Sequence, residues 1–519
     1  MRSGSSYAGG KMIEPGATVL PRLAAPSEAG GFIAGEHRLE SIDDWRWRVP
    51  RTGGMRVEGL VYADRHLLGD ILEDETGGVE AIRQVANVAT LPGIVGRSIG
   101  MPDIHWGYGF PIGGVAAFDP EDGGIVSPGG VGYDINCGVR LLRSGLLEAD
   151  VRPRMTELMN QIMRDLPAGM GARHRRFRLT DAEVREVLVE GAHWTVRKGF
   201  GWPQDLDRIE AGGRLAGADP DAVGARAIER GCPQLGTVGS GNHFIEVNAV
   251  DEIHDARVAG LLGLEIGVVC VLIHSGSRGL GYQVCDDSLD TMLAAAERYG
   301  IDLPDRQLAC APLESPEGRR YFGAMNAAAN YAFANRQMMA HLVREAFALT
   351  LGAGEATRLE LVYDVAHNMA KWEEHEVAGR PRRLCVHRKG ATRAFPPGHP
   401  EIPTAYRDIG QPVLVPGDMA RYSYVLVGTE VAYRESFGST CHGAGRRMSR
   451  KRAKALAAGR ALKREFRERG IEVRTASYAT IAEEIPEAYK DVAEVVEVLH
   501  RAGIARKVAR LKPLGVLKG

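Results

Sequence analysis

The sequence has no excess of charge of either sign. Its 519 residues contain 65 lysines and arginines against 66 aspartates and glutamates, which gives a formal net charge of -1 at pH 7. A chain with this balance has no overall basic field to attract nucleic acid, and it lacks the acidic excess of a solvating chain. The balance argues mildly against a nucleic-acid-binding protein, unless positive charge is concentrated locally.

Long hydrophobic runs and secretion signals are also missing. The longest apolar run, Ile266 to Ile273, is far shorter than the ~20 apolar residues that cross a bilayer, so it fits a buried strand. The N-terminus has no charged start followed by an apolar core, as a secretory signal would have. The 7 cysteines are odd in number and scattered, which favours a reducing compartment over a disulfide framework. We therefore predict a cytoplasmic protein without membrane contact.

Glycine, by contrast, is abundant. The 65 glycines amount to about one residue in eight, against a usual ~7%, and indicate many tight turns and close backbone approaches. Residues 1–37, rich in Gly, Ser, Pro and Ala without an apolar period, are expected to form a flexible extension. No linker or repeat divides residues 38–519, and strands and helices alternate irregularly. We predict an α+β protein with a single large mixed domain over these residues.

The apolar patterns place the regular elements. Helices are expected in the charged segment 150–230, where Thr180 to Glu183 has the pattern of a capping box, and across residues 282–350. Short β-rich runs are expected at residues 244–247, 268–273, 359–365, 384–387, 413–415 and 424–427.

One segment is strongly basic. Residues 446–469 contain eleven lysines and arginines against only Glu465 and Glu468. Ser449 can cap the start and Gly470 the end, so we predict one basic helix. Its positive side chains form either a solvated helix face or a surface that binds phosphates, and the sequence leaves both interpretations open.

Five side chains have the chemistry of metal ligands. Asp134 and Cys137 lie three residues apart in a Gly-rich turn, where a hard carboxylate and a soft thiolate suit a borderline transition metal. His243, His274 and His367 each lie where an expected strand meets a loop, which is a rigid support for a ligand. Any one of them alone is more often a hydrogen-bonded core residue. Together they suffice for two metal ions that share the cysteine, and two-metal sites suit displacement at phosphorus.

A second cluster surrounds His442. The small residues Gly443, Ala444 and Gly445 leave room for a bulky group, and backbone N–H groups of such a turn can cradle phosphate oxygens. A neutral imidazole is a competent nucleophile, so His442 could become nucleotidylated, although a histidine bonded within a tight turn fits this stretch equally well. Other groups that could complete a phosphate site are Arg278, Lys389, Ser423 and Arg446, although each alone is more often a surface charge or a loop hydroxyl. Asp103 and His105 lie in a loop that either supports the metal site or is simply a packed turn.

The chain thus contains five chemistry-bearing motifs, which are Asp134–Cys137, Gly241–Glu246, His274–Arg278, His367–Asn368 and His442–Arg446. These motifs resemble those of the RtcB family of RNA-splicing ligases, and they occur in the family's order. The similarity runs from about Leu39 to Gly519, so it covers all but the N-terminal extension. Five separate matches make the resemblance highly specific.

The resemblance implies a fold in which β-sheets carry a central metal and nucleotide cleft. It also implies an enzyme that uses GTP and Mn²⁺ to join an RNA 2′,3′-cyclic phosphate or 3′-phosphate end to a 5′-hydroxyl end. By this resemblance, Cys137 bridges two Mn²⁺ ions. Asp134 and His243 complete the ligands of one ion, and His274 and His367 complete those of the other.

The resemblance also assigns the remaining roles. His442 would attack the α-phosphate of GTP and form a histidine–GMP intermediate. The residues at family positions that hold the nucleotide are Asn242, His243, Phe244, Ile245, Glu246, His367, Asn368, Pro416, Gly417, Asp418, Met419, Ser423, His442, Gly443, Ala444, Gly445 and Lys518. The residues at family positions implicated in activity are Asp103, Arg278, Lys389 and Arg446.

Two other functions stay open from the residues alone. A binuclear metal-dependent phosphodiesterase or phosphatase could use the same ligands without GTP or a covalent histidine. An RNA-binding protein or chaperone with a structural metal would retain RNA without joining its ends. As partners, the resemblance implies RNA, in tRNA splicing or RNA repair, and an archease-type activator in some family members. We expect a monomer whose RNA binding is confined to the face around His442 and weakens with salt.

Overall fold

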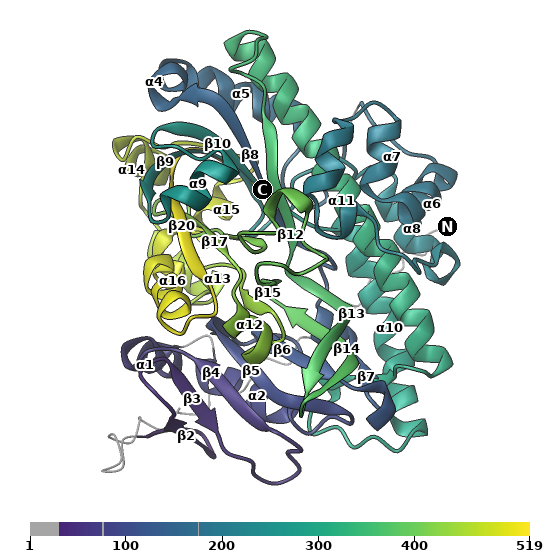
Figure 1. The fold of residues 1–519 in the computed structure, drawn as a ribbon. Helices are drawn as coiled ribbons and strands as arrows, with labels where there is room; N and C mark the ends of the chain where they lie inside the picture. Colours follow the sequence, from purple (N-terminus) through teal and green to yellow (C-terminus); the bar gives the residue numbers. More distant parts are fainter. Residues whose placement is uncertain (1–30, 75–76, 175) are drawn as a thin grey trace, which may run out of the picture.

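Two large β-sheets and the helices packed against them make up the chain (Figure 1). The computed structural model describes residues 31–74, 77–174 and 176–519. The first sheet is antiparallel except between β4 and β5, which run parallel. Its strands, in spatial order, are β1 (Phe32–Ala34), β2 (His37–Ser41), β3 (Arg46–Val49), β4 (Glu58–Tyr62), β5 (Ile94–His105), β6 (Ile112–Phe118), β14 (Arg380–Lys389) and β13 (Asn368–Val377).

The second sheet is antiparallel along its main path. Its strands, in spatial order, are β12 (Glu360–Ala366), β8 (Gly138–Leu147), β10 (Val268–Ser275), β9 (Phe244–Ile253), β20 (Arg506–Lys518), β17 (Ser423–Val427) and β16 (Pro412–Val415). One further strand, β19 (Glu472–Thr475), adds to β20 in parallel. The short strand pairs are β7 (Ile125–Val126) with β11 (Ala311–Pro312) and β15 (Ala391–Arg393) with β18 (Ser439–Cys441).

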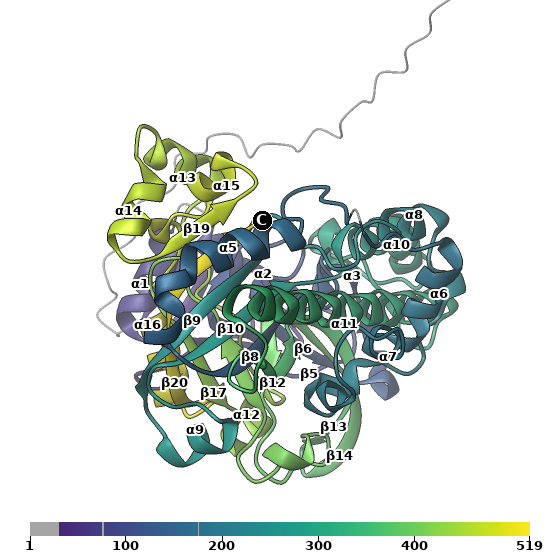
Figure 2. The ribbon, with the colours of Figure 1, turned by 90° about the horizontal axis from the view of Figure 1, so that it is seen from above.

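A long central helix, α11 (Pro316–Leu351), crosses the molecule (Figure 2). Ser315 caps its N-terminus by accepting a hydrogen bond from the Gly318 backbone N–H at 3.0 Å, and Pro316 occupies the first turn, where a missing N–H costs nothing. Helix α11 is buried along most of its length, and its many alanines let neighbouring elements approach closely. The helices gathered at one end of it are α6 (Asp181–Glu190), α7 (Ala192–Arg197), α8 (Ala225–Gly231) and α10 (Arg278–Arg298).

The remaining helices cover the sheets and the edge of the molecule. They are α1 (Arg65–Glu73), α2 (Gly78–Val88), α3 (Pro128–Val131), α4 (Glu148–Val151), α5 (Met155–Asp165), α9 (Ala256–Leu262), α12 (Glu430–Glu435), α13 (Arg450–Ala457), α14 (Leu462–Glu468), α15 (Tyr478–Glu483) and α16 (Val492–Arg501). Over the residues that the structure describes, none of the helices combines the length and the apolarity needed to cross a membrane.

The predicted fold class and most predicted elements are confirmed. The chain is a single mixed α+β domain. Every expected β-rich run overlaps a strand of the two large sheets, and α10 and α11 cover most of residues 282–350. The expected capping box also forms, since the Glu183 N–H donates to Thr180 Oγ1 at 3.3 Å and the Thr180 N–H donates to Glu183 Oε2 at 3.0 Å.

The single basic helix predicted from Ser449 to Gly470 is wrong. Ser449 does cap a helix, because its Oγ accepts a hydrogen bond from the Arg452 N–H at 3.2 Å. The chain then leaves the helical conformation at Ala458 (ψ 130°) and Gly459 (φ +77°), and α14 begins only at Leu462. Glycine adopts this left-handed conformation at little cost, so it separates α13 from α14.

The predicted N-terminal extension ends earlier than residue 37. Residues 1–30 of that prediction lie outside the described residues, but β1 and β2 pair with each other across a tight turn at residues 35–36. Ala34 and Leu39 are fully buried at this pairing. A strand of three residues is too short to show an apolar period, which is why the sequence pattern did not indicate it.

Candidate active site

The candidate metal ligands gather along one edge of the second sheet. Four neighbouring antiparallel strands, β12, β8, β10 and β9, bring their ends to this edge. The register fixes the alignment, because Gly138 at the start of β8 pairs with both Ala366 of β12 and Ser275 of β10. The ligands carried by these strand ends are Cys137 before β8, His243 before β9, His274 in β10 and His367 after β12.

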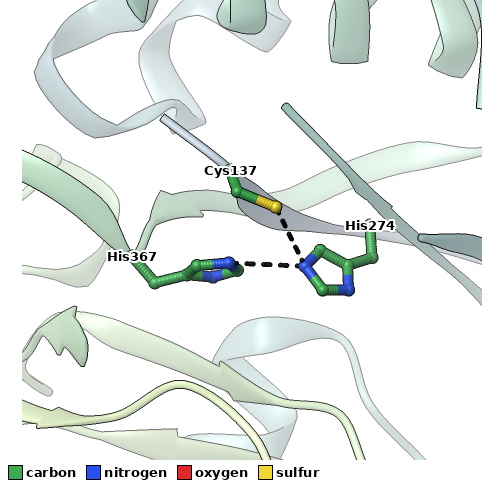
Figure 3. A group of neighbouring side chains, drawn as sticks. All are labelled: Cys137, His274 and His367. Carbon is green, nitrogen blue, oxygen red and sulfur yellow. Dashed lines mark hydrogen bonds between the residues drawn. The ribbon is translucent and has the colours of Figure 1, made fainter. Parts of the chain in front are cut away.

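Three buried side chains form the first ligand set (Figure 3). Cys137 Sγ lies 3.2 Å from His274 Nε2, and His274 Nε2 lies 3.3 Å from His367 Nε2. One ligand atom of each residue lies within 4.8 Å of the other two. One sulfur and two nitrogen donors that converge in this way form a ligand set for a transition metal.

The second ligand set shares the same cysteine. Cys137 Sγ lies 3.2 Å from His243 Nε2, and His243 Nε2 lies 2.7 Å from Asp134 Oδ2. Asp134 packs closely against Gly276, where a β-carbon would lie 2.4 Å from its Oδ1, so a larger residue there would displace the carboxylate. The five predicted ligands therefore lie together as two sets that meet at Cys137.

The protonation states of these groups suit a bound cation. Burial, and then the neighbouring histidines, lower the pKa of His274 and His367 well below the usual range, so both rings are neutral. Burial pushes the pKa of Asp134 upward, but His243, Cys137 and Arg278 together outweigh it and hold the pKa below its ordinary value. Burial and the Asp134 carboxylate raise the pKa of the Cys137 thiol well above its ordinary value. A divalent cation would supply the positive charge that a thiolate here needs, so the donor set fits a metal ion.

A sixth side chain, His442, lies against this cluster. The ring centroids of His442 and His367 are 4.7 Å apart. The Nδ1 of His442 donates to Asp103 Oδ2 at 2.6 Å, and its backbone N–H donates to the same oxygen at 3.2 Å. Because a carboxylate on Nδ1 fixes a proton there, Nε2 is the ring nitrogen that can offer a lone pair. His105 bonds back to the Asp103 carbonyl at 2.9 Å, as expected of a packed turn.

Lys490 supports the turn that contains Asp103. The sequence patterns did not indicate this role for Lys490. Its buried ammonium donates to the carbonyl oxygens of Ile104 at 2.6 Å and Pro102 at 3.2 Å, one on each side of Asp103. Its backbone N–H donates to the Gly445 carbonyl at 3.0 Å, which ties Lys490 to the His442 loop. A lone lysine more than 380 residues away along the chain carries no sequence signal for this role.

A buried arginine on the central helix α11 connects the ligand-bearing segments of the second sheet. The Arg336 guanidinium on α11 donates to the carbonyl oxygens of Asn136 at 2.7 Å and Ser275 at 3.0 Å. Asn136 precedes the ligand cysteine, and Ser275 follows a ligand histidine. Arg336 also donates to both carboxylate oxygens of Asp364 in β12, which Arg140 contacts as well. One guanidinium therefore fixes the relative positions of three strands.

Replacement of Arg336 by methionine should destabilise the chain by about 3–5 kcal/mol, because Asp364 loses one of its partners and two buried carbonyls lose their donor. Urea unfolding followed by circular dichroism measures this loss. Arg320→Met, at an exposed position of the same helix, is the matched control and should change stability by less than about 0.5 kcal/mol. Equal losses in the two variants would contradict the prediction.

Several residues predicted to hold the nucleotide also come together. Ser423 Oγ donates to Glu246 Oε2 at 3.4 Å, and the Lys518 ammonium lies 5.3 Å from the centre of the Phe244 ring. Burial, the largest effect, raises the pKa of Glu246 to about 7. A buried carboxyl, a hydroxyl, an ammonium and an aromatic ring thus form a polar cluster of the kind that recognises a planar, hydrogen-bonding base.

The turn at residues 416–419 lies beside the His442 loop. A β-carbon at Gly443 would lie 3.4 Å from the first carbonyl oxygen of this turn. Asp418 Oδ1 accepts hydrogen bonds from the backbone N–H groups of Ala420 at 2.9 Å and Arg421 at 3.1 Å. The Asp418 carboxylate therefore stabilises its own turn.

Two cations predicted to be important for activity hold loops. The Lys389 ammonium donates to the carbonyl oxygens of Phe110 at 2.9 Å and of Tyr108, and burial lowers its pKa to about 7. Arg278 begins α10 with a φ of +55°, and its Nε donates to Thr237 Oγ1 at 3.1 Å. Lys389 therefore anchors the loop that follows β5, and Arg278 anchors the turn that follows His274.

Arg446 and Lys518 meet at a carboxylate that the sequence patterns did not indicate. Arg446 Nη1 donates to Glu484 Oε1 at 3.0 Å, and the guanidinium lies 5.0 Å from the centre of the Tyr489 ring. The Lys518 ammonium lies 3.5 Å from Glu484 Oε2. Glu484 is fully buried, although it stands in a charged stretch that looks solvent-exposed in the sequence.

The two predicted asparagines differ in their surroundings. Asn368 Nδ2 donates to the Asp134 carbonyl at 3.1 Å, and its Oδ1 accepts a hydrogen bond from the Gly390 N–H at 2.8 Å. It therefore ties one ligand loop to the end of β14. Asn242 is exposed in the loop before β9, next to the ligand His243.

Fold and site together define a class of protein, an enzyme in which buried sulfur, nitrogen and oxygen donors lie beside a histidine that a carboxylate orients. The sequence profile described as "tRNA-splicing ligase RtcB" matches residues 84–519. The chain is 55% identical over 484 residues to the tRNA-splicing ligase RtcB of Archaeoglobus fulgidus, which covers 93% of this chain and 99% of that protein. It is 53% identical over 438 residues to the RNA-splicing ligase RtcB of Mycobacterium tuberculosis, which covers 84% of this chain and 100% of that protein.

These similarities extend over nearly the whole of each relative, so the chain belongs to the RtcB family and is an RNA ligase. The resemblance drawn from the five motifs is confirmed at the level of the family.

Proposed function

We propose that this ligase uses GTP and Mn²⁺ to join RNA 2′,3′-cyclic phosphate or 3′-phosphate ends to 5′-hydroxyl ends through a histidine–GMP intermediate on His442. One observation carries the proposal: His442 donates Nδ1–H to the buried Asp103 and lies against the ring of His367, in the ligand cluster. This arrangement orients a nucleophilic Nε2 beside the site that would hold the metal ions. The binuclear hydrolase considered above needs no such nucleophile.

The proposed first step is transfer of GMP to the enzyme. The Nε2 lone pair of His442 attacks the α-phosphorus of GTP, the N–P bond forms, and the bond from the α-phosphorus to the bridging oxygen breaks. Pyrophosphate leaves with that electron pair. The proton stays on Nδ1, where Asp103 stabilises the positive charge that develops on the ring.

Two further displacements complete the reaction at a 3′-phosphate end, and water first opens a cyclic end to this form. An oxygen of the 3′-phosphate attacks the GMP phosphorus. The N–P bond breaks and His442 recovers its lone pair. The oxygen of the 5′-hydroxyl then attacks the RNA 3′-phosphate, GMP leaves with the electron pair, and the hydroxyl proton passes to solvent. Each displacement is easier than a direct condensation.

The two ligand sets would hold the Mn²⁺ ions, with Cys137 shared between them. When bound, such ions neutralise charge on the transferring phosphoryl group. The chain contributes a rigid cluster at the sheet edge, neutral imidazoles and one carboxylate. Cysteine and histidine donors also attract Zn²⁺, so we expect zinc to compete with Mn²⁺ and inhibit.

End joining with defined RNA tests the proposal. A labelled strand with a 2′,3′-cyclic phosphate and an unlabelled 5′-hydroxyl strand should give a longer product only when GTP and Mn²⁺ are both present. Release of phosphate or opening of the cyclic end without joining, and without any need for GTP, would favour the hydrolase. Retention of RNA without either reaction would favour the RNA-binding protein.

An Asp103→Asn variant should form the histidine–GMP intermediate about 10³–10⁴-fold more slowly. The amide can donate to Nδ1, which would place the ring proton on Nε2 and remove the nucleophilic lone pair. Single-turnover transfer of labelled GMP measures the rate. Asp287→Asn, at an exposed position of α10, is the matched control and should transfer GMP at the parent rate. A rate within tenfold of the parent for Asp103→Asn would show that the Nδ1 contact is unimportant.

GTP binding should depend on pH through Glu246. Burial raises the pKa of this carboxyl to about 7, so it is protonated below that pH and ionised above it. Only the ionised form accepts two hydrogen bonds from guanine N–H groups, so affinity should rise about tenfold per pH unit below 7 and level off above it. Calorimetric titration with GTP between pH 5.5 and 8.5 measures the curve. The Glu246→Gln variant should bind GTP more weakly, and its affinity should no longer change with pH near 7. An unchanged pH dependence in this variant would assign the titration to another group.

We further propose that the enzyme acts as a cytoplasmic monomer on broken or spliced tRNA-like ends, with an archease-type activator as its partner in multiple turnover. Light scattering of the purified chain tests the monomer. Single- and multiple-turnover ligation, with and without added activator, tests the partner: only the multiple-turnover rate should rise.

A further inference from the structure

The positive charge of the chain is concentrated in one small region. Residues 446–469 carry eleven lysines and arginines and two glutamates, a formal charge of +9, so the rest of the chain carries -10. In the structure this segment forms α13 and α14, which project with α15 at one edge of the molecule (Figure 2). A polyanion is therefore attracted to this edge more strongly than to the rest of the chain, whose net charge is negative.

The basic region begins at the candidate active site. The Arg450 guanidinium, at the start of α13, lies so close to Gly241 that a β-carbon there would come within 2.9 Å of Nη2. Gly241 stands two residues before the ligand His243. Arg446, between His442 and α13, shares the buried Glu484 with Lys518. Helix α13 therefore leads outward from the site where the RNA ends would be joined.

Most cations of this region are exposed, and several of them form ion pairs. Lys454 lies 2.5 Å from Glu483, and Arg464 lies 3.6 Å from Glu468, both as surface pairs that phosphates can replace at little cost. Lys451 in α13 and Lys463 in α14 are exposed, and among the described residues no carboxylate forms an ion pair with either. Over the part of the chain that the structure describes, these two lysines offer charge that no ion pair neutralises.

We infer that the α13–α14 surface binds the phosphate backbone of the RNA strand several nucleotides away from the end being joined. The inference rests on the proposed function, because it needs an RNA strand held at His442. Helix α13 has 8 residues and is about 12 Å long, which matches roughly three to four phosphates of one strand. Flexible cations without aromatic platforms contact phosphates and not bases, so this binding is independent of sequence.

A double charge reversal, Lys451→Glu with Lys463→Glu in the full chain, tests the inference. The KM for a 20-nucleotide RNA strand should rise about tenfold, and the slope of log affinity against log salt should become shallower by about 2. The KM for a trinucleotide should rise much less, because such a strand ends before α14 and can lose only its contact with Lys451. GMP transfer to the enzyme without RNA should also stay at the parent rate.

The matched control makes the same change of charge elsewhere. Arg380→Glu with Arg383→Glu reverses two exposed cations on the β13–β14 hairpin, which lies on the side of the molecule away from α13 and α14 (Figures 1 and 2). An unchanged KM and salt slope for the α13–α14 variant would overturn the inference. So would equal effects in the control, or equal effects on the trinucleotide, since either would mean that net charge alone acts.

Damage to the fold is separable from loss of RNA binding. If the double glutamate variant transfers GMP slowly, the milder Lys451→Gln with Lys463→Gln variant is tested in its place. This variant should transfer GMP at the parent rate, and its KM for long RNA should rise about threefold. An unchanged KM in that variant overturns the inference. Failure of the proposed function looks different, because the parent chain itself would then neither accept GMP nor join RNA.

Discussion

In a His442→Ala variant incubated with α-labelled GTP and Mn²⁺, no label should remain on the protein, whereas the parent chain should retain about one label per molecule. His442 is the one histidine of the cluster whose Nδ1 is held by a carboxylate while its ring lies against the ligand set. The bond formed would be an N–P bond, so mild acid should release the label and alkali should not. Denaturing gels followed by autoradiography measure the label on the variant, the label on the parent, and the release of label by acid or alkali.

The matched control is His500→Ala, at an exposed histidine of α16. It should carry label as the parent does, which separates loss of one imidazole from loss of the nucleophile. A parent-like signal in His442→Ala would assign the nucleophile to another residue. Absence of label in the parent and in the control would instead overturn nucleotidylation and leave the hydrolase as the better function.

The fold is predictable from sequence where the side-chain pattern alone decides the local structure. The apolar run 268–273 becomes β10 because every one of its side chains is buried, which leaves no alternative to an interior strand. The side-chain pattern does not predict the break between α13 and α14, because helix-forming residues lie on both sides of Gly459. A glycine inside a helix costs only about 1 kcal/mol, so packing of Ala457 and Leu462 into the core decides whether the helix continues. Such packing is not visible in sequence.

The residues of the candidate site likewise divide into those that the sequence indicates and those that it does not. That Cys137 and the candidate ligand histidines come together is predictable only from the group, because several side chains with metal-ligand chemistry stand at expected strand ends. Lys490 and Glu484 are not predictable, since a lysine and a glutamate in a charged stretch are usually solvent-exposed. Both are buried, and each gains its role only when a distant loop folds against it. A sequence thus indicates the groups that do chemistry more readily than the groups that hold them in place.

Cys137→Ala should remove both metal-binding sets at once, because its sulfur lies 3.2 Å from His274 in one set and 3.2 Å from His243 in the other. Each set would keep only two ligands, and affinity for Mn²⁺ should fall more than about 100-fold at both. Metal analysis after equilibrium dialysis should find two ions in the parent and none in the variant. Both GMP transfer and RNA joining should then fall below detection.

Two single-histidine variants make this prediction specific to the shared ligand. His367→Ala removes a ligand of the first set only, and His243→Ala removes one of the second set only, so each should retain one ion. If the cysteine served one set alone, the Cys137→Ala variant would retain one metal ion, as each single-histidine variant should. Two ions bound at parent affinity in Cys137→Ala would instead show that the sulfur is not a ligand. Because the three side chains are similarly buried, differences in metal content among the variants report ligation and not general loss of packing.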